Sequence, residues 1–350
     1  MNRKFYLDLA KDGIRFPIGS DLVLHEKPNH QVIVKSGEQL GKVVEETARR
    51  FKTPLAIPLM DLMVEKEFLL AQMGVPETER ATFHFNGLPE KALRDDFAAK
   101  TQSAPFPVRL QANIDAVSYI AGETDLRPVG MVIGPFSLMT KLFSDPITPV
   151  YIAGTGVAAG EDAEVAAIEW GLEVATLVIL RSVEAQIKAG AKVIMMAEPA
   201  ANKVFFSPKQ MAEGSDIFSR YCINRVRQIK QTLDRAGVDF ILHDCGELTN
   251  TMLQEIAAID PVILSLGSSR CLWEDAKFVG KNTVLYGNLP TKRFIQDSPT
   301  KEEIVAQARE IVAKMKAVDH PFILGSECDV LSVPGYEELL REKVSAFLNA

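Results

Sequence analysis

Seven short runs rich in Val, Ile and Leu recur along this chain of 350 residues and constrain its fold more than any other feature. They occupy residues 55–60, 129–134, 192–198, 239–245, 262–267, 283–289 and 322–328. Near-continuous apolar runs are typical of strands that are buried on both faces of a parallel sheet. The sequence therefore predicts an α/β fold.

Longer amphipathic segments separate these runs. Residues 216–237, residues 299–317 and the stretch after Tyr336 carry apolar residues at three- and four-residue spacing, which predicts helices. Strands that alternate with helices indicate βαβ units. An eighth strand at residues 82–85 or 108–112 would complete a (β/α)8 TIM barrel, although an open doubly wound sheet fits the same pattern.

The first 50 residues differ from the rest. They contain one short strand candidate, residues 31–35, and otherwise predict an N-terminal helical cap on a barrel of residues 51–350. The strict Gly-x-Gly-x-x-Gly fingerprint of dinucleotide-binding folds does not occur. Its relaxed form at residues 154–159 (GTGVAA) is more typical of a glycine-rich turn before a helix, because the expected acid does not follow.

Composition excludes several classes of protein. The net charge of −7 and the lack of any Lys- or Arg-rich run argue against a general nucleic-acid binder. No apolar run approaches the length of a membrane span, and the N-terminus shows no signal-peptide pattern. Four cysteines do not make a disulfide framework, so we expect a cytoplasmic protein with reduced thiols.

The strongest chemical signal lies at the ends of two predicted strands. His243 and Cys245 are two residues apart, so their side chains share one face of a strand, and Cys328 ends the last strand. Active sites of barrels lie at this carboxyl end. Two thiolates and one imidazole with an open fourth position are typical of catalytic zinc. Alternatively, each residue is a packed core side chain.

Carboxylates at the same strand ends form a second group. Asp61 and Glu198 each close an apolar run, and we predict both as catalytic residues that orient a zinc ligand or position the substrate. Glu247 follows the His-x-Cys segment and is predicted to bind substrate, and Glu327 precedes the last cysteine of the set. The alternative for each is a rim charge that faces solvent.

Methionines cluster at these strand ends as well. Met60, Met131 and Met196 are predicted to line a mouth that accepts an aromatic ring or a large cofactor, because Met adapts to irregular apolar surfaces. The alternative is that they belong to the core.

From about Pro54 to the C-terminus, the order of these segments resembles the uroporphyrinogen decarboxylase superfamily. The segments are IPLMDLMVEKEFLLAQMGV, RPVGMVIGPFSLMTKLF, GAKVIMMAEPAANKVFFSP, VDFILHDCGELTNTMLQEIAAIDPVILSLG, VLYGNLP and FILGSECDV. Within that superfamily, His-x-Cys and a distant Cys resemble the zinc ligands of corrinoid methyltransferases. These include the methyltransferase component of bacterial O-demethylases and the methylcobamide:coenzyme M methyltransferases.

The resemblance implies that zinc held by His243, Cys245 and Cys328 serves methyl transfer to or from a corrinoid (cobalamin) on a separate corrinoid-binding protein. The favoured direction moves a methyl group from an O-methyl substrate, such as a methoxylated aromatic, to cob(I)amide. The alternative transfers it from the methylated carrier to a thiol of the coenzyme M type, with Arg270 and Lys292 as possible clamps for an anionic thiol.

Two further alternatives are weaker. A lyase of the decarboxylase type needs several cations for a porphyrinogen, whereas the N-terminal segment offers Arg15 alone, and GNLPT lacks the acid of the decarboxylases. A structural zinc or corrinoid-docking protein would normally close the zinc with a fourth Cys or His. Neither Cys222 nor Cys271 is suitably placed in the sequence.

Overall fold

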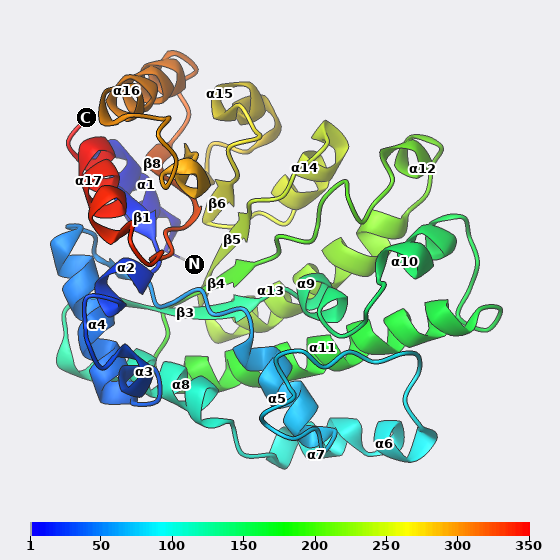
Figure 1. Cartoon of the computed structure of the whole chain (residues 1–350). Coiled ribbons are helices and arrows are strands. Elements are labelled where there is room, and N and C mark those ends of the chain that lie inside the picture. The colour runs from blue at the N-terminus through cyan, green and yellow to red at the C-terminus, as the bar shows by residue number, and fades with distance from the viewer. Residues whose placement is uncertain (1) are drawn as a thin grey trace.

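The apolar runs form one parallel sheet in the computed structural model, which describes residues 2–350 (Figure 1). The eight strands are β1 (Arg15–Ile18), β2 (Leu55–Ala56), β3 (Arg127–Ile133), β4 (Val193–Ala197), β5 (Asp239–Asp244), β6 (Ile263–Leu266), β7 (Val284–Leu289) and β8 (Phe322–Asp329). Their order in the sheet is β1-β8-β7-β6-β5-β4-β3-β2, and every neighbouring pair is parallel.

Helices surround this sheet (Figure 1). They are α1 (Arg3–Lys11), α2 (Asp21–Leu24), α3 (His30–Ile33), α4 (Gly37–Arg50), α5 (Val64–Gln72), α6 (Lys91–Asp95), α7 (Phe97–Ser103), α8 (Val108–Glu123), α9 (Pro135–Thr140), α10 (Ile147–Gly154), α11 (Ala163–Lys188), α12 (Pro208–Ala212), the π-helix η1 (Ser219–Ile223), α13 (Asn224–Ala236), α14 (Asn250–Ala257), α15 (Leu272–Asp275), the 3₁₀ turns η2 (Ala276–Phe278) and η3 (Thr291–Arg293), α16 (Lys301–Ala317) and α17 (Glu337–Leu348). Within residues 2–350, no helix combines the length and apolar character that crossing a bilayer requires.

Alternate residues of each strand enter two separate apolar layers, as the two-residue period of a strand requires. The inner layer lies inside the curl of the sheet and includes Met131, Met195 and Tyr286. The outer layer lies between sheet and helices and includes Met196 and Leu242. Burial on both faces explains why the strands are almost wholly apolar in sequence.

Helix α1 packs at the amino ends of the strands. Tyr6 and Leu9 of this helix belong to the inner layer. The Tyr6 hydroxyl lies 3.0 Å from a carboxylate oxygen of Asp239, which also pairs with Arg127 at 2.6 Å. Since Asp239 and Arg127 begin their strands, these contacts close the amino end of the sheet. The carboxyl end is left for a functional site, as in barrel enzymes.

The prediction of an α/β fold with eight parallel strands is confirmed, but the ladder does not close into a full barrel. Among the described residues, β1 and β2 are the two edges of the sheet. A side-chain hydrogen bond of 2.7 Å crosses this seam, from the Ser20 hydroxyl after β1 to the Ile57 carbonyl after β2. The sheet is therefore a curled, barrel-like structure with one open seam.

The eighth strand is β1, so both predicted positions for it were wrong. Residues 108–112 begin α8, and residues 82–85 are irregular apart from an isolated bridge at Phe85. The prediction of a strand at residues 31–35 was also wrong, because these residues form the end of α3 and the turn that follows it. β1 has only four residues and contains Pro17, which is tolerated because an edge strand leaves one side unpaired.

The first 50 residues contain α1 to α4 together with β1, so this segment contributes a strand to the sheet in addition to its helices. The division of the chain at residue 50 stays a prediction. Of the predicted helices, residues 216–237 become η1 followed by α13, which ends at Gly237 in the left-handed region. Residues 299–317 contain α16, and α17 follows Tyr336.

Candidate metal centre

Three potential metal ligands meet at the carboxyl end of the sheet. The ligand atoms of His243, Cys245 and Cys328 all lie within 4.8 Å of one another. His243 is in β5 and Cys328 in β8, and β6 and β7 lie between these strands in the sheet. In a flat sheet, three strand spacings would separate them by about 14 Å. The curl of the sheet therefore brings the three residues together.

The imidazole of His243 is fully buried and is oriented by the next strand. Its Nδ1 lies 2.8 Å from the hydroxyl of Ser265, the residue opposite it in the β5–β6 ladder. Its Nε2 is buried and has no hydrogen-bond partner within residues 2–350. A buried polar atom without a hydrogen-bond partner destabilises the folded protein, so Nε2 is expected to have a ligand. If Nδ1–H donates its hydrogen bond to the Ser265 hydroxyl, the lone pair of Nε2 is free to bind a metal.

The sulfurs of Cys245 and Cys328 lie close enough to affect each other's ionisation. A hydrogen bond from Cys328 lowers the pKa of the Cys245 thiol, and nearby His243 and Lys292 act in the same direction. The same hydrogen bond, together with burial, raises the pKa of Cys328. A divalent cation bound by both sulfurs would take the place of the thiol protons, because metals bind the thiolate form of cysteine.

The donor set fits zinc. Two sulfurs and one imidazole nitrogen are ligands that zinc prefers, and within the described residues no fourth His, Cys, Asp or Glu joins them. The other two cysteines are elsewhere, since Cys222 is buried in the outer layer and Cys271 is exposed. Three protein ligands with one open position are the arrangement of a catalytic zinc site.

The loops after β6 and β7 are both hydrogen-bonded to Glu327 near the end of β8, the residue next to Cys328. One carboxylate oxygen of Glu327 accepts the backbone N–H of Lys292 at 3.2 Å, and the other accepts the Ser268 hydroxyl at 2.6 Å. Gly267 permits close approach to the loop after β5, because a Cβ there would lie 2.6 Å from the Cys245 carbonyl oxygen. This packing fixes the backbone that carries two of the three ligands.

Glu198 was predicted to be catalytic, and the structure places its carboxylate at the start of α9. It accepts the backbone N–H groups of Phe136 at 3.2 Å and Ser137 at 2.6 Å, and it lies against Gly134. Burial raises its pKa to about 7, although hydrogen bonds from the Ser137 side chain and backbone oppose the shift. Glu198 therefore fixes the loop after β3 and is not one of the clustered ligands.

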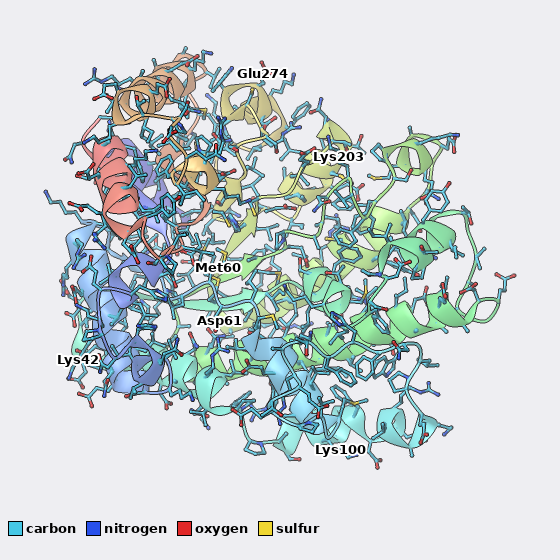
Figure 2. All side chains as sticks on the ribbon, viewed as in Figure 1. Lys42, Met60, Asp61, Lys100, Lys203 and Glu274 are labelled. Carbon is cyan, nitrogen blue, oxygen red and sulfur yellow. The ribbon has the colours of Figure 1, made fainter. Side chains whose placement is uncertain are left out.

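Asp61 lies just beyond β2, near the middle of the molecule in Figure 2. Its carboxylate pairs with Arg109, which also contacts Glu67 at 2.7 Å, and about a fifth of the Asp61 side chain is exposed. The neighbouring Met60 is partly buried against the inner layer. Asp61 is thus a positioned carboxylate at the rim that does not belong to the ligand cluster.

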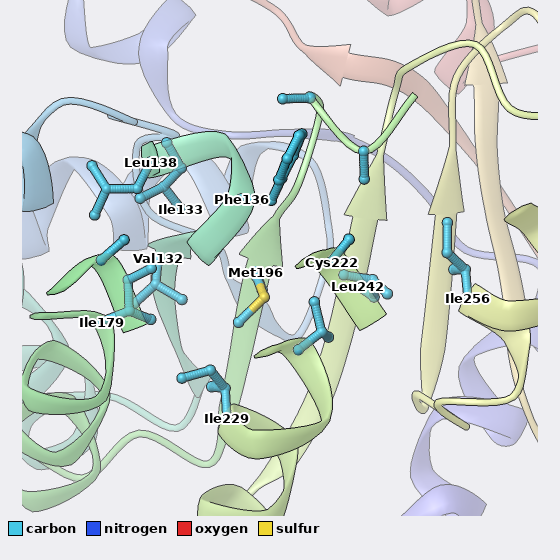
Figure 3. Close-up of a cluster of buried hydrophobic side chains, with 14 of the residues drawn as sticks. Val132, Ile133, Phe136, Leu138, Ile179, Met196, Cys222, Ile229, Leu242 and Ile256 are labelled. Atoms are coloured by element: carbon cyan, nitrogen blue, oxygen red, sulfur yellow. The ribbon is translucent and has the colours of Figure 1, made fainter. Parts of the chain in front are cut away.

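The remaining predicted substrate residues are not brought together. Met131 belongs to the inner layer, with 8 % of its surface exposed. Met196 points away from the curl and is fully buried in the outer layer near Cys222 and Leu242 (Figure 3). Glu247 is largely exposed, and its carboxylate lies 2.5 Å from the Lys203 ammonium group. This position matches the alternative in which Glu247 is a charge at the rim that faces solvent.

Ser265 is a site residue that the sequence analysis did not identify. A single hydroxyl inside the apolar run VILSLG was an available signal, because such a group needs a partner when buried. Arg270 was considered as a clamp, but it bonds to Asp275, the Leu248 carbonyl and the Asn250 side chain. Its guanidinium group is therefore already hydrogen-bonded to residues of its own and a neighbouring loop.

Comparison with a family model decides the family. The model of uroporphyrinogen decarboxylase (URO-D) matches residues 24–339, which is most of the chain. The chain belongs to the URO-D family. No curated protein matches this URO-D family member in a sequence comparison.

A solved structure shares the fold. A methyltransferase from Methanosarcina mazei is similar, with a TM-score of 0.64 and 20% identity, over 95% of this chain and 91% of that one. A candidate vitamin-B12-independent methionine synthase from Listeria monocytogenes gives a TM-score of 0.46 and 10% identity, over 88% and 92% of the two chains. At 20% identity the first likeness shows a shared fold alone, and the second, with its lower TM-score, supports no conclusion.

Proposed function

We propose that this URO-D family member is a zinc-dependent methyltransferase. It would move a methyl group from an O-methyl substrate, such as a methoxylated aromatic, to the cob(I)amide of a separate corrinoid protein. The observation that carries the proposal is the partnerless Nε2 of His243 beside the sulfurs of Cys245 and Cys328. The name of the similar methyltransferase from Methanosarcina mazei supports methyl transfer as the reaction class. Thiolate ligands fit a reducing cytoplasm.

The proposed reaction balances without an external oxidant. The bond between the methyl carbon and the ether oxygen breaks, and the oxygen keeps the electron pair as an oxyanion that later takes a proton from water. The electron pair of cob(I)amide forms the new cobalt–carbon bond, so cobalt becomes formally cobalt(III). When bound, zinc would supply a Lewis acid that stabilises charge on the leaving oxygen.

The chain's own residues would hold and orient the reactants. His243 Nε2 and the sulfurs of Cys245 and Cys328 would hold the ion. We propose that Asp61, held in place by Arg109, positions a polar group of the substrate. Glu198 would act indirectly, by holding the start of α9 in place. Of the methionines, Met60 and Met131 remain proposed apolar contacts.

Anaerobic stopped-flow spectroscopy tests the proposal. Zinc-loaded protein mixed with a cob(I) corrinoid protein and methoxy-aromatic donors should convert the cob(I) spectrum to that of methyl-cobalt(III). Cys328→Ser should slow this conversion at least ~100-fold, because a hydroxyl is a far poorer zinc ligand than a thiolate. Cys271→Ser, which changes an exposed cysteine outside the site, is the matched control and should react normally.

Other outcomes would select other functions. Rapid demethylation of the methylated carrier by a thiol, with no reaction across a broad ether panel, would contradict the proposed direction and favour the coenzyme M type of transfer. Release of CO2 from a porphyrinogen by the metal-free protein would favour a lyase.

A further inference from the structure

A cavity of about 510 Å³ lies at the amino end of the sheet, whereas the metal centre lies at the carboxyl end. Its lining includes residues 13–15, which lead into β1, and residues 50–52, which precede β2. These two strands are the edges of the open seam. Residues of α2 and α17, which lie beside β1 in Figure 1, complete the lining. The cavity therefore flanks the amino end of the seam.

Part of the cavity wall is apolar. Phe51 is only partly buried, and it packs against the inner layer, the outer layer and a third apolar cluster that includes Val43 of α4. Leu22 and Val344 continue this wall, and both are buried. A cavity of this size with an apolar wall can remove the body of a small molecule from water.

Cations dominate the charged part of the lining. Four Lys or Arg side chains face one acid, Glu26, and these cations are Arg15, Arg50, Lys52 and Arg341. The chain as a whole has a net charge of −7, so this positive excess is a local feature. Such a concentration of positive charge favours an anionic ligand.

Two of the four cations are already bound within the fold. Arg15 donates hydrogen bonds to two backbone carbonyls in and just after α17, at 3.2 and 2.6 Å. Arg50 lies 2.6 Å from a carboxylate oxygen of Glu26 and 2.6 Å from one of Glu46. These two side chains hold the cavity walls in place.

Lys52 and Arg341 are the cations that remain for a ligand. Arg341 lies 3.9 Å from Glu26, a carboxylate that Arg50 already engages more closely. Lys52 is exposed and forms no ion pair within residues 2–350. Its φ of 52° lies in the left-handed region that favours glycine. Keeping a lysine in this conformation costs free energy, and residues of this kind cluster at ligand sites.

We infer that this cavity binds an amphipathic anion, a small molecule with an aliphatic or aromatic body and one carboxylate or phosphate head. Lys52 and Arg341 would pair with the head, since both head groups accept charge-assisted hydrogen bonds. Phe51 and Leu22 would contact the body. The ligand would bridge residues before both edge strands, so it would hold the seam together. This site is separate from the metal centre and does not require methyl transfer.

Calorimetric titration of the full-length protein with decanoate and with decyl phosphate, both below their micelle concentrations, tests the site. One equivalent should bind, and 1-decanol, which has the same chain without a charge, should bind about 10-fold more weakly. Lys52→Met and Arg341→Met should each weaken binding about 10-fold. Glu26→Gln should strengthen it, because this change removes the acid that competes for the cations. Lys100→Met, which removes an exposed cation on α7 outside the cavity, is the matched control.

Hydrogen exchange locates the bound probe, because amides of residues 13–15 and 50–52 should become better protected. The tighter of the two probes identifies the head as a carboxylate or a phosphate. Binding of neither probe, or equal binding of 1-decanol, would overturn the site. Unchanged affinity in both Lys52→Met and Arg341→Met, or an equal loss in Lys100→Met, would overturn it as well.

Discussion

At the residue scale, the orientation of His243 depends on Ser265. A buried imidazole has two nitrogens, and only one can be the metal ligand. The 2.8 Å contact between Nδ1 and the Ser265 hydroxyl selects the ring orientation in which Nε2 faces the sulfurs. Partners of this kind raise the basicity of the ligand and hold it in place.

Ser265→Ala should therefore weaken zinc binding about 10- to 100-fold, because outer-shell partners of metal ligands typically have effects of this size. Competition with a chromophoric chelator measures the affinity. Ser269→Ala is the matched control, because its exposed hydroxyl makes only a 3.5 Å contact with the Gly246 carbonyl. Equal zinc affinity in Ser265→Ala and wild type would show that the hydroxyl does not orient the ligand.

Sequence reasoning identified the three residues that cluster at the strand ends, but not the orientation of the side chains around them. His243, Cys245 and Cys328 could be predicted because their residue types are rare and chemically specific and because they lie at strand ends. Met196 could not be distinguished from Met195, because both faces of a buried strand are apolar. An acid that ends a strand, such as Glu198, can equally serve a neighbouring helix start, and only the packing decides.

At the scale of elements, α5 packs against α11 through a buried acid. Glu65 of α5 is fully buried and accepts a hydrogen bond of 3.2 Å from Ser182 of α11. Its second oxygen has no partner within residues 2–350. Burial raises the pKa of this carboxyl to about 8, so it is neutral in the folded protein at neutral pH.

This acid should make stability depend on pH. The folded pKa lies above the unfolded value, so its contribution is fully present below about pH 4.5 and is lost as the pH rises through about 8. Between pH 6 and 9 the wild type should lose roughly 3 kcal/mol more unfolding free energy than Glu65→Gln, which cannot ionise. Urea unfolding at both pH values measures the difference. Glu77→Gln, an exposed acid, should behave like the wild type; an equal pH dependence in all three proteins would contradict the account.

Elements with strong local signals were predictable, and those with weak signals were not. Helix α16 begins with a capping box between Thr300 and Glu303, and this pattern can be recognised from the sequence alone. β1 escaped prediction because four residues with an internal proline carry no periodic pattern. Its strand conformation depends on pairing with β8, which lies some 300 residues later along the chain.

At the scale of the whole molecule, the metal centre is a product of the curl of the sheet. β5 and β8 are not neighbours, and their ligands meet only because the sheet between them bends. The alternation of strands and helices predicted the parallel sheet but could not determine how far it closes. The seam between β1 and β2 depends on single contacts such as the hydrogen bond from Ser20 to Ile57.

The central claim is that His243, Cys245 and Cys328 hold one zinc ion with an open fourth position. Zinc K-edge X-ray absorption on protein loaded with one equivalent of zinc tests it most directly. The account predicts two sulfurs at about 2.3 Å and two nitrogen or oxygen neighbours at about 2.0–2.1 Å. Cys328→Ser should lose one sulfur from the shell. A shell without sulfur, or one that is unchanged in Cys328→Ser, would contradict the account.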